Sequence, residues 1–471
     1  MIIFRKIKFQ LQSISRIVLM GITLMLLLFF GCAKKEPKSP NIIFLLTDDQ
    51  RWDAMSCMGN LDVKTPEMDK LAKEGVLFTH ACVTTPICAI SRASILSGQY
   101  ARKHGIIDFK THFTDSVYQN TYPMQLKKNR YRIGFIGKYG IGLGKDFPKE
   151  KYDYWDCFPN QGHYWHKDSL GNLTHLTKLL GNSALEFLKG TSKEQPFCLS
   201  VSFKAPHCQD KDPQQYLFDS TYIDVYKDKI FPVPETADSS YWNSFPSFFK
   251  ENNEARIRWH LRFETPEKFQ HSLRGYNTLI YGVNVQIKRI RNWLKENGQD
   301  KNTIIMLMGD NGYYLAEHGM AGKFYAHEES IKVPFIIYDP RAPKEKKGLK
   351  NDRMVLNIDV APTILDYAGV SIPETMQGKS VRELIYNEEL PWRNDFLFEH
   401  PFKYKTIPRS EGVVTRDWKY VRFIDRQPGY EWMYHTGVDP KEKYNLAKDE
   451  KYADIKARLK KRFEELVKKY K

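Results

Sequence analysis

Polar side chains suited to chemistry follow four apolar runs of the chain, at the point where each run ends. The four groups are Asp48-Asp49 after residues 41–46, Lys138 after 132–137, Pro206-His207 after 197–203, and Asp310-Asn311 after 302–308. In open α/β sheets, ligands bind outside the carboxyl ends of the strands. If the four runs are strands of one sheet, we expect their polar groups to build a single site.

The acidic part of this site favours a hard divalent cation. Asp48, Asp49, Asp310 and Asn311 offer carboxylate and amide oxygens. Ca²⁺ and Mg²⁺ prefer such ligands, whereas zinc prefers nitrogen and sulfur. Paired acids and Asp-Asn-Gly also occur in ordinary turns, so neither pair is specific by itself.

The segment that begins at Cys88 carries a candidate nucleophile. It reads Cys-Ala-Ile-Ser-Arg-Ala-Ser-Ile-Leu-Ser-Gly and follows Thr-Thr-Pro at residues 84–86. A nucleophile at a helix N-terminus beside Arg92 lies where oriented N–H groups favour an anion. A buried structural cysteine that opens a helix is the alternative interpretation.

The Cys88 segment resembles the signature of the formylglycine-dependent sulfatases, which are members of the alkaline-phosphatase superfamily. In that family Cys or Ser is followed by any residue, Pro or Ala, Ser, Arg, and a helix of small residues ending in Thr-Gly. The resemblance extends over about residues 41–425. Further family segments are matched in order by Asp48-Asp49, Gly137-Lys138, Pro206-His207, Asp310-Asn311-Gly312, Gly322-Lys323, DVAPTILDYAG and EGVVTRDWKYVRF.

The resemblance implies a mechanism and a role for each matched residue. Cys88 would be oxidised to formylglycine, whose hydrated form is the nucleophile. One divalent cation, Ca²⁺ in the first place and Mg²⁺ as the alternative, would be bound by Asp48, Asp49, Asp310, Asn311 and the converted Cys88. The side chains that would surround the sulfate and neutralise its charge are Arg92, Lys138, His207 and Lys323. His207 or Lys323 would protonate the leaving alcohol.

Two positions depart from the family pattern. Ile90 stands where the family has Pro or Ala, at a position that the maturation enzyme reads. Gly140 stands where the family has a His that assists the formylglycine. The candidates to replace that imidazole are His163, His166 and His318.

Two segments rich in histidine, aromatic and basic residues, 160–166 and 398–412, are candidates for contact with the substrate. Such combinations bind anionic sugars, although packing between domains explains them equally well. The candidate substrate-binding residues are His104, His163, His166, His318 and His400. A structural hydrogen bond is the alternative for His104 and His318.

The elements that must position these residues alternate along the chain. The four apolar runs and a fifth at 333–339 alternate with helical patterns at 66–74 and 279–298. This order predicts an α/β fold with a large, mostly parallel or mixed sheet between helices, which is alkaline-phosphatase-like by the resemblance. We expect the catalytic domain over 41–374. A smaller α+β domain over 375–471 would end in a basic amphipathic helix.

The N-terminus has the layout of an export signal. Basic residues precede an apolar run at 17–30, which is short for a bilayer span of about 20 residues, and Gly31-Cys32 follows. This ending resembles the bacterial lipoprotein signal, in which Cys32 becomes the lipidated N-terminus; a transmembrane anchor or a buried helix is the alternative. We therefore expect a signal peptide over 1–31, a tether over 32–40, and an exported, membrane-anchored lipoprotein in the periplasm or at the cell surface.

Composition bounds the class of protein and its partners. The chain has 471 residues, is 42% hydrophobic and carries a net charge of +16, which excludes a disordered chain or a small disulfide scaffold. The positive charge suits an anionic partner, but no zinc finger or RNA-recognition signature is present, so we do not expect nucleic acid binding. The expected partners are a sulfated glycan as substrate, the formylglycine-generating maturation enzyme, and the membrane.

Three functions remain open at this point. Hydrolysis of a sulfate ester is favoured. A phosphodiesterase or phosphonate hydrolase of the same superfamily would use a similar metal site. A catalytically dead, glycan-binding lipoprotein is the third possibility, because Ile90 and Gly140 depart from the family pattern.

Overall fold

The structure is a computed structural model that describes residues 39–167, 171–387, 389–425 and 429–471. The expected signal peptide, Cys32 and nearly all of the tether lie outside these residues. The chain from Pro40 to Lys471 forms one compact unit. Among the helices of the described ranges, none is both long and apolar enough to cross a membrane.

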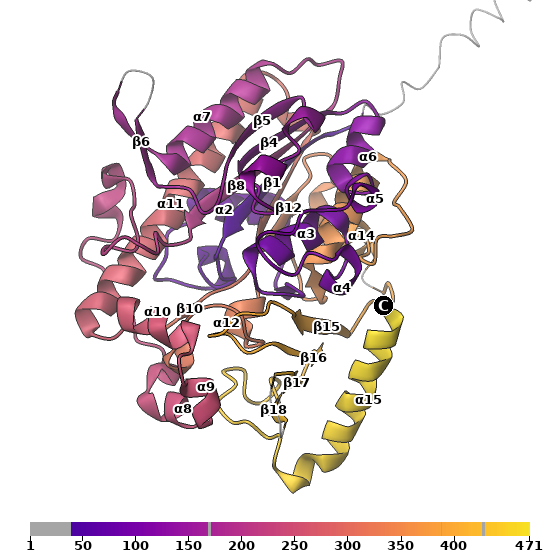
Figure 1. The fold of residues 1–471 in the computed structure, drawn as a ribbon. Helices are drawn as coiled ribbons and strands as arrows, with labels where there is room; N and C mark the ends of the chain where they lie inside the picture. Colours follow the sequence, from indigo (N-terminus) through magenta and orange to yellow (C-terminus); the bar gives the residue numbers. More distant parts are fainter. Residues whose placement is uncertain (1–38, 168–170, 388, 426–428) are drawn as a thin grey trace, which may run out of the picture. The chain divides into compact units, whose positions relative to one another are not determined.

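One sheet of eight strands runs through this unit in the order β13-β2-β12-β9-β1-β8-β4-β5 (Figure 1). The strands are β1 (Asn41–Asp48), β2 (Val76–Phe78), β4 (Arg132–Lys138), β5 (Tyr154–Phe158), β8 (Phe197–Pro206), β9 (Thr303–Gly309), β12 (Phe335–Tyr338) and β13 (Leu349–Asn351). From β9 to β5 all neighbours are parallel, whereas β12 is antiparallel to both β9 and β2. The predicted large, mostly parallel sheet is confirmed.

Side chains of β1 alternate between two hydrophobic cores, one on each face of the sheet. Ile42, Phe44 and Leu46 pack in one core, and Ile43 and Leu45 pack in the other. Because both faces are covered, β1, β8 and β9 are buried along almost their whole length. This burial explains why these strands have continuous apolar sequences without polar alternation.

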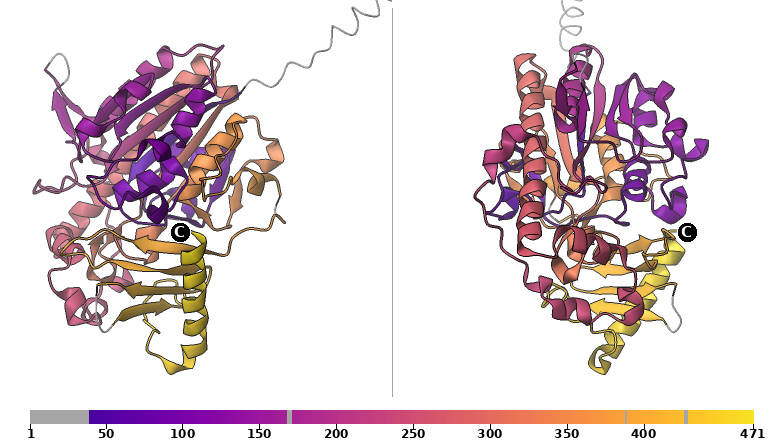
Figure 2. Two further views of the ribbon diagram at one scale, coloured as in Figure 1. Left: turned by 45° about the vertical axis from the view of Figure 1, so that its right-hand side comes forward. Right: turned by 60° about the vertical axis from the view of Figure 1, so that its left-hand side comes forward.

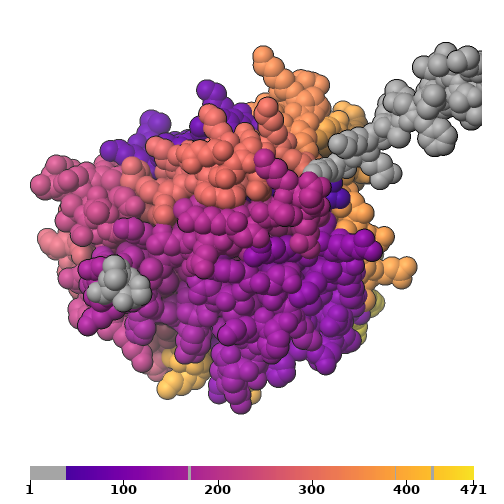
Figure 3. Space-filling model, turned by 90° about the horizontal axis from the view of Figure 1, so that it is seen from above, coloured from indigo at the N-terminus to yellow at the C-terminus, as the bar shows by residue number. Residues whose placement is uncertain are grey.

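Helices form a layer on each face of the sheet (Figure 2). One layer contains α2 (Pro66–Glu74), α7 (Leu176–Lys189) and α11 (Pro266–Glu296), and the other contains α3 (Cys88–Ser97), α6 (Tyr122–Lys128) and α13 (Val360–Ala368). α7 packs against α11. In Figure 3 the part of the chain around α7 is magenta, the part around α11 is salmon, and the two meet at the surface. The predicted coverage of both faces is therefore confirmed.

Helix α11 starts earlier than the apolar pattern over 279–298 predicts. The side chain of Thr265 caps it by accepting a hydrogen bond from the N–H of Lys268, and Pro266 occupies the first turn. Several polar residues of the first turns face solvent, so this part of the helix lacks the apolar periodicity on which the prediction was based. The predicted helix over 66–74, in contrast, is confirmed with its proline at the start.

The C-terminal part contains a four-stranded antiparallel sheet and a helix. In sheet order the strands are β15 (Asp395–His400), β16 (Ser410–Thr415), β17 (Lys419–Phe423) and β18 (Tyr430–Tyr434). Helix α15 (Ala453–Lys469) covers this sheet with Leu459, Phe463 and Leu466. The predicted α+β character is confirmed, and α15 lies where a basic amphipathic helix was expected. The domain boundary near residue 375 stays a prediction.

Short elements connect these layers. The strand pairs are β3 (Ala81–Cys82) with β14 (Val355–Leu356), β6 (Trp165–Lys167) with β7 (Leu173–His175), and β10 (Tyr314–Leu315) with β11 (Ala321–Gly322). The shorter helices are α4 (Ala101–His104), α5 (Asp115–Tyr118), α8 (Ser239–Asn243), α9 (Ser247–Lys250), α10 (Glu254–Arg262), α12 (Glu328–Ile331) and α14 (Arg382–Tyr386).

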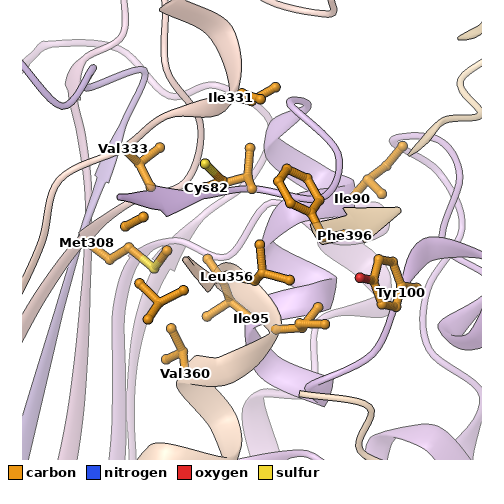
Figure 4. Close-up of a cluster of buried hydrophobic side chains, with 14 of the residues drawn as sticks. Cys82, Ile90, Ile95, Tyr100, Met308, Ile331, Val333, Leu356, Val360 and Phe396 are labelled. Carbon is orange, nitrogen blue, oxygen red and sulfur yellow. The ribbon is translucent and has the colours of Figure 1, made fainter. Parts of the chain in front are cut away.

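Helix α3 lies in the hydrophobic core, and every one of its residues is buried. Figure 4 shows Ile90 and Ile95 of this helix in a cluster with Leu356 of β14, Val360 of α13 and Phe396 of β15. Because Phe396 belongs to the C-terminal sheet, that sheet contributes to the same core cluster as the helix that begins at Cys88. The position of Cys88 therefore depends on both parts of the fold.

We predict that Ile90→Ala, which restores a residue type of the family signature, lowers the free energy of unfolding by about 2–5 kcal/mol. The reason is that Ile90 is 0% exposed, so the truncation leaves a cavity in the core. Urea unfolding measures the change. The matched control is Ile257→Ala on α10, where the side chain is 45% exposed and a change within about 0.5 kcal/mol is expected. Equal losses in the two variants would contradict the assigned packing.

Candidate active site

The carboxyl ends of β1 and β9 bring three carboxylates together. Thr47 of β1 is in register with Gly309 of β9, so Asp48 and Asp310 leave their strands at the same level. The chain then turns at Asp49 with φ of 65°, and the N–H of Asp49 donates to Oδ1 of Asp310 over 3.1 Å. One oxygen from each of the three carboxylates lies within 4.8 Å of the other two.

Arg92 balances the charge of Asp310 from within α3. Its Nε and Nη2 lie 2.9 Å and 2.8 Å from Oδ2 of Asp310. Its Nη1 donates to the main-chain carbonyl of Lys138 over 2.5 Å and to the hydroxyl of Ser202. These bonds join α3 to β4 and β8, so the guanidinium is fixed relative to the strand ends.

Lys138 and Lys323 balance the other two carboxylates. The Nζ of Lys138, at the end of β4, donates to Asp48, and the Nζ of Lys323, directly after β11, donates to Asp49. All four side chains are at most 3% exposed. Buried charges are costly unless they are paired, so the three cations and three carboxylates form one mutually dependent group. We call these six residues the charged cluster.

The thiol of Cys88 lies within the charged cluster. Cys88 is the first residue of α3; Nζ of Lys323 lies 2.7 Å from its Sγ, and the Sγ donates to Oδ1 of Asp48 over 3.4 Å. Burial and the negative charge of Asp48 raise the pKa of this thiol to about 12, although Lys138 and Lys323 oppose the shift. The unmodified thiol is therefore protonated at neutral pH and is a weak nucleophile.

The carboxyl groups of Asp48 and Asp310 have pKa values shifted in opposite directions. Burial tends to raise the pKa of Asp48, but Lys138, His207 and Arg92 bring it well below its usual value. Burial and the charge of Asp48 raise the pKa of Asp310 to about 6, although Arg92 opposes the shift. A further positive charge at this position would favour the ionised form of Asp310.

The oxygen atoms at the strand ends fit a divalent cation. Oδ2 of Asp49 and Oδ1 of Asn311 are buried without a hydrogen-bond partner among the described residues, although buried acceptors are normally satisfied. Together with the carboxylates of Asp48 and Asp310 they form a set of hard oxygen ligands. This donor set suits Ca²⁺ or Mg²⁺.

His207 lies beside the charged cluster at the end of β8. It follows Pro206, the last residue of that strand, and its Nε2 lies 3.7 Å from Oδ2 of Asp49. Its Nδ1 lies 2.7 Å from the carbonyl oxygen of Cys208, so Nδ1 is the protonated nitrogen that donates there. Burial lowers the pKa of this imidazole to about 4, so the ring is neutral at pH 7 in this arrangement.

Two side chains that the sequence did not single out hold the lysine and arginine in place. Oε1 of Gln161 accepts a 2.6 Å hydrogen bond from Nζ of Lys138, and the hydroxyl of Ser202 accepts from Arg92. Gln161 lies in the segment 160–166, which was expected to contact substrate through its histidines. No sequence pattern marks Ser202, because its role depends on β8 lying next to β4.

Gly140 lies close to the side chain of Arg92 and has a left-handed backbone conformation. Its φ is +74°, and a Cβ at this position would lie 3.0 Å from Cδ of Arg92. A histidine here would require the Arg92 side chain to shift slightly, and the left-handed conformation would add strain. Gln161, rather than an imidazole, contacts Lys138 in this structure.

Two of the expected substrate histidines have protein partners of their own. His104 at the end of α4 contacts Oγ of Ser94 at 3.0 Å and the N–H of Ile106 at 3.1 Å. His318 stacks on His327 with a ring-centroid distance of 4.3 Å. Among the described residues, no hydrogen bond joins either ring to the charged cluster, and their roles in substrate binding stay predictions.

The other three expected histidines lie near residues that neighbour or contact the charged cluster. His163 and His166 line a hollow that also includes Gln161, the partner of Lys138. His400 ends β15, is fully buried, and has neither ring nitrogen hydrogen-bonded within the described residues. Its ring lies 6.1 Å from that of Phe324, the residue after Lys323. Contacts of these three rings with substrate stay predictions.

The site combines a cysteine at a helix N-terminus, hard oxygen ligands on adjacent strand ends and three buried cations. This combination suits chemistry on an anionic ester. The chain belongs to the sulfatase family: residues 40–370 match the family model described as Sulfatase. Residues 316–469 match the model described as N-sulphoglucosamine sulphohydrolase, C-terminal. The chain is therefore a sulfuric ester hydrolase, and the resemblance seen in the sequence is confirmed.

Comparisons with known proteins give the same class. The chain is 28% identical to N-acetylglucosamine-6-O-sulfatase of Bacteroides thetaiotaomicron, over 93% of this chain and 88% of that protein. The solved structure of BT4656 in complex with its substrate D-glucosamine-2-N,6-O-disulfate has a TM-score of 0.77 and 26% identity, covering 92% of this chain and 98% of the other. A phosphonate monoester hydrolase of Silicibacter pomeroyi, with a TM-score of 0.76, 20% identity and coverage of 92% and 96%, shares the fold.

Proposed function

We propose that this protein removes sulfate from a sulfated glycan, with position 88 as the nucleophile and a divalent cation bound by the strand-end oxygens. The observation that carries the proposal is the place of the Cys88 Sγ, between a carboxylate oxygen of Asp48 and the ammonium group of Lys323. A sulfate ester at this point would meet cations that neutralise its charge. Membership of the sulfatase family supports the reaction.

The nucleophile is a formylglycine that a maturation enzyme makes from Cys88. When present, formylglycine and Ca²⁺, or Mg²⁺ in its place, supply a hydrated aldehyde as nucleophile and Lewis acidity at one site. The raised pKa of the thiol supports conversion, because an unmodified, protonated Cys88 would be a poor nucleophile at neutral pH. The oxygens of Asp49 and Asn311 that lack hydrogen bonds support the cation.

The cationic side chains provide the electrostatic part of catalysis. Arg92, Lys138 and Lys323 are held by carboxylates before substrate arrives, so little reorganisation is needed when charge develops on the sulfate group. Lys323 is the better placed proton donor for the leaving alcohol. Burial tends to lower the pKa of its ammonium group, but Asp49 and the neighbouring acids raise it well above the usual value, and it lies 2.7 Å from the Cys88 Sγ. The Nε2 of His207 is then free to accept a proton.

The substrate that we propose first is a 6-sulfated glucosamine residue of a glycan. The 28% identical relative is named for this position of this sugar, and the BT4656 structure holds a glucosamine that is 6-O-sulfated. Lipidation at Cys32 would place the enzyme outside the cytoplasm, where such glycans occur. Phosphodiester or phosphonate hydrolysis is an outcome that the test below distinguishes.

We predict that Cys88→Ala lowers kcat/KM for N-acetylglucosamine 6-sulfate by more than about 10³-fold, because the nucleophile is removed. Cys198→Ala is the matched control: this cysteine is 2% exposed in the core strand β8, so its loss removes a thiol without touching the charged cluster. Sulfate release measures both. Retained turnover in Cys88→Ala would refute the nucleophile. Turnover of bis(4-nitrophenyl) phosphate with none of any sulfate ester would establish the phosphoesterase alternative.

We also predict that the protein binds one equivalent of Ca²⁺ and that Asp49→Asn weakens this binding by at least about tenfold. The substitution keeps the shape of the side chain and removes one of the ligand charges. Titration calorimetry and the calcium-dependent shift in Tm measure it independently of activity. Asp62→Asn, on a partly exposed carboxylate paired with Lys229, is expected to leave the affinity unchanged. Equal affinity in both variants would argue against a cation at the strand ends.

A further inference from the structure

A hollow of about 490 Å³ lies beside the charged cluster, between the loops that follow β5 and β8. Its lining includes Gln161, His163, His166, Lys204, Asp210 and Lys211. The volume is within the range of about 300–1,000 Å³ that is usual for sites of small ligands.

Gln161 forms a shared wall between the hollow and the catalytic candidates. Its side-chain oxygen accepts from Nζ of Lys138 over 2.6 Å, and its main-chain oxygen accepts from Nζ of Lys204 over 2.8 Å. Tyr164, in the same loop, donates its hydroxyl to the carbonyl of His207 over 2.5 Å. Gln161 therefore contacts both Lys138 of the charged cluster and Lys204 of the lining of the hollow.

Lys204 is a buried cation without a carboxylate partner. It is 1% exposed, and its Nζ donates to the main-chain oxygens of Gln161 and Gly162 at 2.8 Å and 3.3 Å. Within the described ranges no carboxylate forms an ion pair with it. Burial, with repulsion from Lys138, lowers its pKa to about 8. Two carbonyls accept from its ammonium group, and the Nζ also lies 4.9 Å from the centroid of the Tyr164 ring, so its charge is solvated by dipoles and a ring face where it lines the hollow.

The remaining charges of the hollow are also favourable to an anion. Lys211 and His163 are exposed on its rim, and His166 lies half-buried next to them. The one acidic side chain of the lining, Asp210, is already bound to Nη2 of Arg262 at 2.7 Å and to the thiol of Cys208 at 3.1 Å. Its charge is thereby offset, and the net field in the hollow is positive.

We propose that this hollow binds a second anionic group of the substrate, a sulfate or a carboxylate of the same sugar or of the adjoining one, with Lys204 as its buried contact. The inference rests on the proposed function, because it assumes that the first sulfate reaches Cys88. Sulfated glycans that carry several anionic groups are then the preferred substrate class, and singly sulfated neutral sugars are hydrolysed with a lower kcat/KM.

The test compares kcat/KM for three substrates on the matured enzyme. These are N-acetylglucosamine 6-sulfate, D-glucosamine-2-N,6-O-disulfate, and a 6-sulfated disaccharide in which the second sugar is a uronic acid. We expect one or both of the doubly anionic substrates to be preferred by at least about tenfold, and the favoured one identifies the second group as sulfate or carboxylate. Equal values for all three would overturn the inference.

The variants Lys204→Met and, on the exposed rim, His163→Ala with Lys211→Ala are expected to reduce this preference to about twofold or less. Lys178→Ala, an exposed lysine on α7 away from the hollow, is expected to keep it. Because His163 and Lys211 are exposed, the rim variant still tests the hollow if Lys204→Met does not fold. Unchanged preference in both hollow variants would overturn the inference.

Binding of the doubly anionic disaccharide to Cys88→Ala, measured by calorimetry, distinguishes a failure of the proposed function from a failure of the anion site in the hollow. If no sulfate ester is hydrolysed but binding depends on Lys204, the proposed function fails and the hollow stands as an anion site. If sulfate esters are hydrolysed without preference and binding does not depend on Lys204, the hollow fails and the proposed function stands.

Discussion

The mutual neutralisation of three carboxylates and three cations in a buried space is the constraint on which this molecule depends. Asp48, Asp49 and Asp310 converge because parallel strands end at one edge of the sheet. Without Arg92 and the two lysines, this concentration of negative charge would oppose folding. The same cations lie where a sulfate ester would be bound. They therefore neutralise the buried carboxylates in the folded protein and would also neutralise the charge of the sulfate group during catalysis.

The scaffold holds this charge balance with elements that are far apart in the sequence. Helix α3 brings Cys88 and Arg92 to the strand ends, and Ile90 anchors the helix in the core. Phe396 of the C-terminal sheet packs in the same core cluster as α3. His400 is the last residue of the same strand, and its ring lies 6.1 Å from the ring of Phe324, which follows Lys323. The C-terminal sheet therefore contributes to the core cluster that holds α3 and its first residue, Cys88.

Much of the fold and the charged cluster could be predicted, because both follow from local rules. Buried parallel strands require continuous apolar runs, and the rule for strand ends predicts that Asp48, Lys138, His207 and Asp310 lie together. Lys323 follows no strand of the large sheet and is predicted only by the resemblance to the sulfatase family. The antiparallel direction of β12 is not encoded in its own residues, because a buried strand has the same apolar pattern in either direction.

The side chains that prediction missed act through contacts between distant segments. Gln161 has no motif, and its importance arises from the two hydrogen bonds that it accepts, one from Lys138 and one from Lys204. Lys204 lies within an apolar strand, where a single lysine has no periodic signal. The start of α11 at Pro266 was missed for a different reason, because a cap and a proline defined it while its first turns were polar.

The central claim is that position 88 provides the nucleophile as formylglycine. Peptide mass spectrometry across Cys88, on protein made in a host with a sulfatase-maturing system and assayed for sulfate release, tests it most directly. We expect the peptide to be lighter by the difference between a thiol and an aldehyde, with turnover in proportion to the converted fraction. Full sulfate-ester turnover by protein in which Cys88 is entirely unmodified would contradict the claim.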